Sequence, residues 1–230
     1  MKIIKMIGLL LISSVVATYA NACKDAVVLV HGNTASPSSW NNTVSELYRR
    51  GYSSSDLFLP NWGSKTCAAC NNHSGSEEAP VRNAIINAVN ASCTGRIDVI
   101  AHSMGVTLSI QQIDKLAASG FVDSFVGIAG ATKGLRTCGV YPFNVWSSTC
   151  GRDGLSISSP FLDSIANVPI GRNVYSIKSN IDQIVCATGV CTVNGVHSSR
   201  IDGEDASYTY VLGHFGLQTD TAVQQVNLIQ

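Results

Sequence analysis

One stretch, a short apolar segment leading directly into a serine between small residues, constrains this chain most. Residues 97–100 are rich in β-branched side chains, which predicts a buried strand. Ala101-His102-Ser103-Met104-Gly105 follows, and a helical pattern begins at once. A serine on such a tight turn stands clear of the sheet, near the backbone N–H groups of the helix, which favour developing negative charge. The sequence therefore predicts a nucleophilic serine at Ser103.

Strand-like and helix-like segments alternate along the rest of the chain. Apolar runs predict further strands at 26–30, 56–60, 125–129 and 173–177. Helical spacing predicts a helix through Trp40 and Leu47 that ends at Gly51, and others at 79–89, 104–119 and 217–228. With 230 residues, one domain with a substantial core is expected. The fold class is therefore α/β, a compact domain whose mostly parallel sheet has helices on both faces.

The first 22 residues have the layout of a secretory signal peptide. Lys2 and Lys5 precede an apolar run over 6–16, which leads to Ala20-Asn21-Ala22. The run is too short to span a bilayer comfortably. We expect cleavage after Ala22, with Ala20 as the alternative, and a secreted domain over 23–230, either extracellular or periplasmic. Basic and acidic residues are equal in number, so nothing suggests a nucleic-acid partner.

The cysteine content fits secretion. An even number of cysteines in a secreted chain favours disulfides, here four bridges among Cys23, Cys67, Cys70, Cys93, Cys138, Cys150, Cys186 and Cys191. Lipidation of Cys23 is an alternative that would leave an odd thiol. Cys67-x-x-Cys70 could also suggest a redox or zinc site, but no second such pair accompanies it. Proximity alone favours the pairs Cys138–Cys150 and Cys186–Cys191.

A nucleophilic serine needs a base, and the base needs a carboxylate that orients it. Two histidines follow Ser103 in the sequence. His214 lies between glycines just before the last helical segment, where a loop can reach the carboxyl edge of the sheet. His197 lies in a turn-like stretch that we expect to be exposed. We therefore predict His214 as the base.

The acid is predicted from its place in the chain. Asp182 comes soon after the strand at 173–177, on the loop where such an acid belongs. Other aspartates between Ser103 and His214 are expected to be solvated loop carboxylates: Asp163, Asp202 and Asp205.

Two backbone N–H groups are expected to hold the negative charge that develops on the substrate. One belongs to Met104, directly after the serine, and the other to Asn33, in the loop after the first strand. His31 precedes that loop and is expected to brace it rather than to transfer protons.

Together these stretches resemble the small Bacillus-type lipases and the related class 2 lipases, which have the α/β-hydrolase fold. The resemblance rests on residues 28–32, 101–105, 179–185 and 213–216, and covers about residues 27–223. The family's elbow motif reads A-H-S-M-G, as it does here. The resemblance implies hydrolysis of carboxylic esters of glycerol without a cofactor or metal. It also implies a catalytic triad of Ser103, Asp182 and His214, with Asn33 and Met104 as oxyanion donors.

Two features depart from the family's pattern. The family usually has a second glycine after the elbow, where this chain has Val106. The cysteine-containing region from Cys138 to Cys150 has no counterpart in the smallest members, so acyl preference does not transfer. The segment from Thr137 to Leu162 is either a surface loop whose aromatic side chains pack onto the core, or a short cap beside the acyl pocket.

Alternative functions remain open at this point. The same triad could serve a thioesterase or an amidase, because the triad does not choose the leaving group. A secreted binding protein that has lost catalysis would lack a triad member, and all three are present. The expected partner is a small-molecule or lipid ester, with transient contact to a lipid surface, and the protein is expected to be a monomer. Sequons begin at Asn41, Asn72 and Asn90.

Overall fold

A computed structural model describes residues 23–230; the predicted signal peptide at 1–22 lies outside the described residues. Six strands form one all-parallel sheet in the order β2-β1-β3-β4-β5-β8. The strands are β1 Ala26–Val30, β2 Leu57–Phe58, β3 Ile97–His102, β4 Val122–Ile128, β5 Asn173–Ser179 and β8 Ala206–Tyr210. A separate antiparallel hairpin consists of β6 Thr192–Val193 and β7 Val196–His197. The mostly parallel sheet predicted from the alternation of segments is confirmed.

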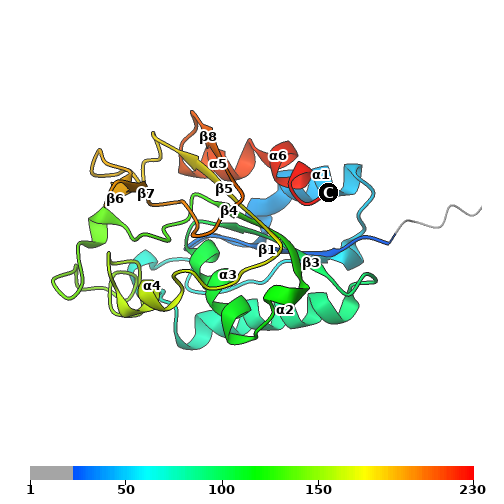
Figure 1. Cartoon of the computed structure of the whole chain (residues 1–230), viewed down its shortest axis with the longest axis horizontal. Coiled ribbons are helices and arrows are strands. Elements are labelled where there is room, and N and C mark those ends of the chain that lie inside the picture. Colours follow the sequence, from blue (N-terminus) through cyan, green and yellow to red (C-terminus); the bar gives the residue numbers. More distant parts are fainter. Residues whose placement is uncertain (1–22) are drawn as a thin grey trace, which may run out of the picture.

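Helices cover both faces of the sheet, α2 and α3 on one side and α1, α5 and α6 on the other (Figure 1). The α-helices are α1 Asn41–Arg49, α2 Glu78–Ala91, α3 Met104–Lys115, α4 Pro160–Ser164, α5 His214–Thr219 and α6 Ala222–Asn227. Short 3₁₀ turns occupy Pro37–Trp40, Ser54–Asp56, Ala68–Cys70, Gly75–Glu77, Ser119–Phe121 and Arg136–Cys138.

The central strands are mainly apolar because both faces of the sheet are covered. Every residue of β1 and β3 is buried. Val28 and Val99 belong to the cluster that packs against α2 and α3. Val27 and Ile100 belong to the opposite cluster, beneath α1, α5 and α6. Because all six strands are parallel, their carboxyl ends lie at the same edge of the sheet.

Several elements differ from the sequence prediction, among them the unpredicted hairpin β6–β7 and helix α4. The elbow helix ends at Lys115 rather than 119, because Ala117 adopts a left-handed conformation with φ 50°. The closing helix is divided into α5 and α6, with a break at Asp220. The edge strand β8 was not predicted, because its mixture of serine, threonine and half-buried tyrosines lacks an apolar run.

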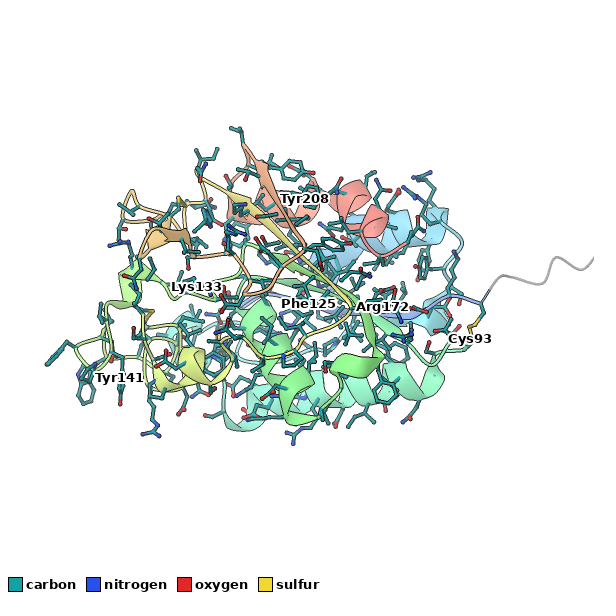
Figure 2. The ribbon with its side chains drawn as sticks, in the orientation of Figure 1. Cys93, Phe125, Lys133, Tyr141, Arg172 and Tyr208 are labelled. Atoms are coloured by element: carbon teal, nitrogen blue, oxygen red, sulfur yellow. A yellow bond between two sulfur atoms is a disulfide. The ribbon has the colours of Figure 1, made fainter. Side chains whose placement is uncertain are left out.

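Four disulfides join all eight cysteines, in the pairs Cys23–Cys93, Cys67–Cys70, Cys138–Cys150 and Cys186–Cys191. The two pairs predicted from proximity are present. The segment 137–151, which contains the Cys138–Cys150 bridge, is called the stapled loop below. It lies at the far end of the molecule from Cys93, as the position of Tyr141 shows in Figure 2. Over residues 23–230, every helix is too short or too polar to cross a bilayer.

Candidate active site

The turn at Ser103 has the strained geometry that a strand-to-helix serine requires. Ser103 has φ 55° and ψ −130°, and its N–H donates to the Ile128 carbonyl at 2.8 Å. Glycine is necessary at position 105 of the turn and at position 32 of the loop that contacts it. A Cβ on Gly105 would lie 2.4 Å from the His31 carbonyl oxygen, and one on Gly32 would lie 2.9 Å from the Ser103 Cβ. The strain is therefore held by close contact between the elbow and the loop after β1.

Val106, where the family usually has glycine, is accommodated by glycines elsewhere. Val106 is fully buried. A Cβ on Gly130 would lie 2.9 Å from its side chain, and one on Gly127 would lie 3.0 Å away. Gly127 in β4 and Gly130 after it therefore leave the room that the Val106 side chain occupies.

The structure brings Ser103, His214 and Asp182 together. The Ser103 Oγ lies 2.9 Å from the Nε2 of His214, and the His214 Nδ1 lies 2.8 Å from the Asp182 Oδ2. His214 is the first residue of α5, and its N–H donates to the Gln183 side chain at 2.8 Å. Its carbonyl oxygen accepts from the Nε2 of His102 at 3.1 Å. The ring of His214 is therefore held through both its backbone and its side chain.

Asp182 lies on the loop that follows β5, and its environment favours the ionised form. It is almost fully buried, and its Oδ1 accepts from the N–H groups of Ile184 and Val185. Burial by itself raises the pKa of Asp182, but the hydrogen bond and charge of His214, with the two N–H groups, lower it overall. A carboxylate held in this way can orient the imidazole and stabilise its protonated form.

The alternative acids lie elsewhere. Asp202 pairs with Lys133, and Asp205 accepts from the N–H of Val174 at 2.7 Å. Asp163 lies on α4. These carboxylates have local structural partners or positions away from the contact between Ser103 and His214.

His197 corrects the expectation of an exposed turn. Its hairpin folds back onto the sheet, so the imidazole is buried and its Nε2 lies 3.1 Å from the Ser179 carbonyl oxygen. Burial lowers the pKa of His197. The residue ties the β6–β7 hairpin to the end of β5, which precedes the loop of Asp182.

The loop after β1 places Asn33 beside the elbow, and His31 braces it. The Nδ1 of His31 donates to the Gly32 carbonyl at 2.8 Å, so its Nε2 can accept from the Trp62 N–H at 3.3 Å and from the Lys65 Nζ at 3.1 Å. The rings of His31 and Trp62 stack, with centroids 5.2 Å apart. Burial lowers the pKa of His31 to about 4. The imidazole of His31 is therefore neutral and hydrogen-bonded through both ring nitrogens, as expected of a residue that holds the loop in place.

One residue in this region escaped the sequence prediction. Asn71 is almost fully buried, and its amide nitrogen donates to the Asn33 Oδ1 at 2.5 Å and to the Ser64 carbonyl at 3.0 Å. Its Oδ1 accepts from the Ser64 N–H at 2.7 Å. The Asn33 amide in turn donates to the Ala68 carbonyl at 2.9 Å. The proximity of Asn71 to the Cys67–Cys70 pair was the only sequence signal, and it did not indicate contact with Asn33.

Two groups of side chains have the spacing of metal ligands. In the first, Cys186 and Cys191 form a disulfide beside His197, so neither sulfur is a free thiolate. The second, Asp25, Asp98 and Asp123, lies near the amino ends of β1, β3 and β4, at the opposite edge of the sheet from Ser103. Arg96 and Arg172 pair with Asp123.

The arrangement around Ser103 can support acyl transfer. A hydroxyl, an imidazole and a carboxylate form one continuous hydrogen-bonded row. Met104 follows Ser103 directly, and Asn33 follows Gly32, on which a Cβ would lie 2.9 Å from the Ser103 Cβ. Among residues 23–230, neither the Asn33 N–H nor the Met104 N–H donates to an acceptor within the protein. Free N–H groups beside a nucleophile can hold the negative charge of a tetrahedral intermediate.

Comparison with solved structures agrees with this fold. Bacillus licheniformis lipase BlEst2 in its mature form has a TM-score of 0.64 and 15% identity, over 91% of this chain and 93% of that one. Aspergillus fumigatus lipase B has a TM-score of 0.60 and 16% identity, over 84% of this chain. The chain spans about half of that lipase, 49% of its length. A structure reported for the metagenome-derived lipolytic enzymes LipS and LipT has a TM-score of 0.58 and 15% identity, over 89% and 92%.

Sequence comparison identifies the family. Comparison with curated proteins gives no match. The sequence model of the family described as lipase (class 2), however, matches residues 24–227, from the residues before β1 to the end of α6. Because this match includes nearly all of the described residues, the chain belongs to the class 2 lipase family, as the resemblance at the elbow and the histidine loop predicted.

Proposed function

We propose that the protein is a secreted serine hydrolase of carboxylic esters, with Ser103, His214 and Asp182 as its catalytic triad. The observation that carries the proposal is the row of two hydrogen bonds, 2.9 Å and 2.8 Å, that joins the hydroxyl, the imidazole and the carboxylate. Membership of a lipase family and the fold shared with lipases support an ester as the substrate. The substrate class proposed is an acylglycerol or a similar small-molecule or lipid ester.

The reaction begins when the Ser103 Oγ attacks the ester carbonyl carbon while the His214 Nε2 takes the hydroxyl proton. The electron pair of the carbonyl moves onto its oxygen, where the N–H groups of Met104 and Asn33 stabilise it. The C–O bond to the alcohol then breaks, and His214 gives its proton to the leaving oxygen. Water attacks the acyl-enzyme in the same way and releases the carboxylic acid.

His102 and Gln183 are proposed as positioning residues for His214. His102 is buried, and burial lowers its pKa to about 3, so it is neutral and donates from Nε2 to the His214 carbonyl. Gln183 accepts from the His214 N–H, next to the triad acid in sequence. Both contacts fix the backbone from which the catalytic imidazole projects.

Hydrolysis of p-nitrophenyl esters of increasing chain length tests the proposal. Ser103→Ala should lower kcat by several orders of magnitude, because triad members act as a unit. It should also abolish labelling by a fluorophosphonate probe. Ser45→Ala, at an exposed serine of α1, is the matched control and should keep full activity.

Matched ester, thioester and amide substrates separate the proposed esterase from a thioesterase or amidase on the same scaffold. Fluorophosphonate labelling that persists in Ser103→Ala would refute the proposed nucleophile. Intact mass of the exported protein would test cleavage after Ala22.

A further inference from the structure

The stapled loop presents the most exposed apolar side chains of the described chain. Trp146 is 100% exposed and Phe143 is 92% exposed. Val140 and Val145 are each more than half exposed. Large apolar side chains gathered on one exposed segment mark an interaction site more often than scattered ones do.

The sequence expectation for this region holds only in part. Phe161 and Leu162, beyond the loop, pack into the core as one of the two interpretations predicted. Phe143 and Trp146 instead point into solvent, so they neither pack onto the core nor line an enclosed acyl pocket. Their exposure needs another explanation.

The backbone of the stapled loop is held in place. The disulfide closes it between Cys138 and Cys150, and the Val145 N–H donates to the Cys138 carbonyl at 2.9 Å. The Tyr141 N–H donates to the Ile157 carbonyl at 2.9 Å. Because the backbone of the loop is already ordered, little backbone entropy is lost when its exposed aromatic side chains bind a surface.

The stapled loop also lies beside the proposed site. Its Thr149 Oγ1 donates to the Ala68 carbonyl at 2.5 Å, and its Ser148 N–H donates to the Ala69 carbonyl at 3.0 Å. The Asn33 side chain donates to the same Ala68 carbonyl. The base of the loop and Asn33, the proposed oxyanion donor, therefore contact the same short segment of the chain.

The distribution of charge in and around the stapled loop indicates the kind of surface that it fits. Residues 137–151 contain no charged side chain; the exposed Arg136 precedes them, and the exposed Arg152, followed by Asp153, comes after them. Tryptophan and tyrosine favour the boundary between lipid headgroups and acyl chains, and arginine favours phosphate or carboxylate headgroups. Trp146 and Phe143 project into solvent from the loop that Tyr141 marks at one end of the molecule (Figure 2), so they suit insertion into a deformable lipid layer.

We propose that the stapled loop is a lipid-surface anchor, in which Trp146 and Phe143 insert at the headgroup boundary and Arg136 and Arg152 contact anionic headgroups. The anchor rests on the proposed function, because it would bring Ser103 to esters that are held in a lipid layer. Its residues contact the lipid surface and take no part in bond making or breaking.

Tryptophan fluorescence tests the anchor in the unaltered protein. Trp40 and Trp62 are buried, so of the three tryptophans only Trp146 is fully exposed. With vesicles of phosphatidylcholine and phosphatidylglycerol, the emission should shift to the blue, and lipids brominated in the upper acyl chain should quench it. Sedimentation with the vesicles measures the affinity independently.

Variants assign the binding to the loop. Trp146→Ser should weaken vesicle binding by about 10- to 100-fold, as expected for loss of a buried aromatic side chain, and should remove the blue shift. Phe121→Ser, at a half-exposed phenylalanine just before β4 and thus at the opposite edge of the sheet, is the matched control and should bind normally. Hydrolysis of a soluble acetate ester should be unchanged in both variants.

The anchor would be overturned if vesicles left the emission unchanged, or if Trp146→Ser bound vesicles as tightly as the unaltered protein. It would also be overturned by a blue shift that grows with protein concentration in the absence of vesicles, which would assign the loop to a second copy of the chain. Vesicle binding does not require hydrolysis, so failure of the proposed triad in Ser103→Ala would be seen separately.

Discussion

Asn71→Ala tests the link between the loop of residues 61–71 and Asn33, the proposed oxyanion donor. The substitution removes three hydrogen bonds, two donated by the amide nitrogen to Asn33 and Ser64 and one accepted from the Ser64 N–H. Partners left unsatisfied in a buried site cost about 1–3 kcal/mol each. Asn33 and Ser64 are only partly buried, so water can replace part of the loss.

We expect the free energy of unfolding to fall by about 2–4 kcal/mol in Asn71→Ala. For a domain of this size, that loss corresponds to a decrease in melting temperature of about 4–15 °C. The Asn33 N–H remains, but its loop loses the contact that positions it. A displaced donor should lower kcat about 10- to 100-fold with little change in KM, because it acts mainly in the transition state.

The assay compares kcat and KM on a soluble butyrate ester with thermal melting of the same samples. Asn71→Asp keeps an acceptor for the Ser64 N–H but cannot donate to Asn33, so it should lose activity to a similar extent. Asn72→Ala, whose side chain accepts from Ser74 in the same loop, is the control and should keep kcat. A kcat within about threefold of the unaltered protein in Asn71→Ala, despite lower stability, would refute the positioning argument.

Two further predictions follow from buried carboxylates. Asp182→Asn should lower kcat about 10³- to 10⁴-fold in steady-state kinetics, because the carboxylate no longer fixes the tautomer of His214 or stabilises its charge. Asp202→Asn is the control and should leave kcat unchanged. Equal losses of kcat in the two variants would refute the assignment of Asp182 as the acid. Burial, with Asp25 and Asp123 nearby, raises the pKa of Asp98 to about 8. The folded state therefore keeps a proton that the unfolded chain releases above about pH 4, so the stability supplied by this group is lost as the pH rises from 4 to 8. Asp98→Asn should melt several degrees higher at pH 8, with a difference that shrinks toward pH 4; melting curves with a constant difference would contradict this.

Local patterns in the sequence predicted much of the fold, and they singled out three side chains that the structure brings into contact. Apolar runs such as 26–30 predict strands buried on both faces, because only such runs tolerate complete removal from water. The small residues around Ser103 predict the strained turn, since backbone contacts leave no room for a Cβ at Gly105. The order of serine, aspartate and histidine along the chain pointed to Asp182 and His214.

Tertiary packing decided what these local patterns could not. Asn33 and Asn71 are 38 residues apart, and no periodicity predicts that their amides meet. The turn-like sequence around His197 suggests exposure, yet the hairpin folds onto Ser179 and buries the ring. β8 lacks an apolar run and forms a strand because β5 offers it an unpaired edge. In each case the decisive contact joins segments far apart in the chain, so it exists only once the sheet order and the layers above and below it are set.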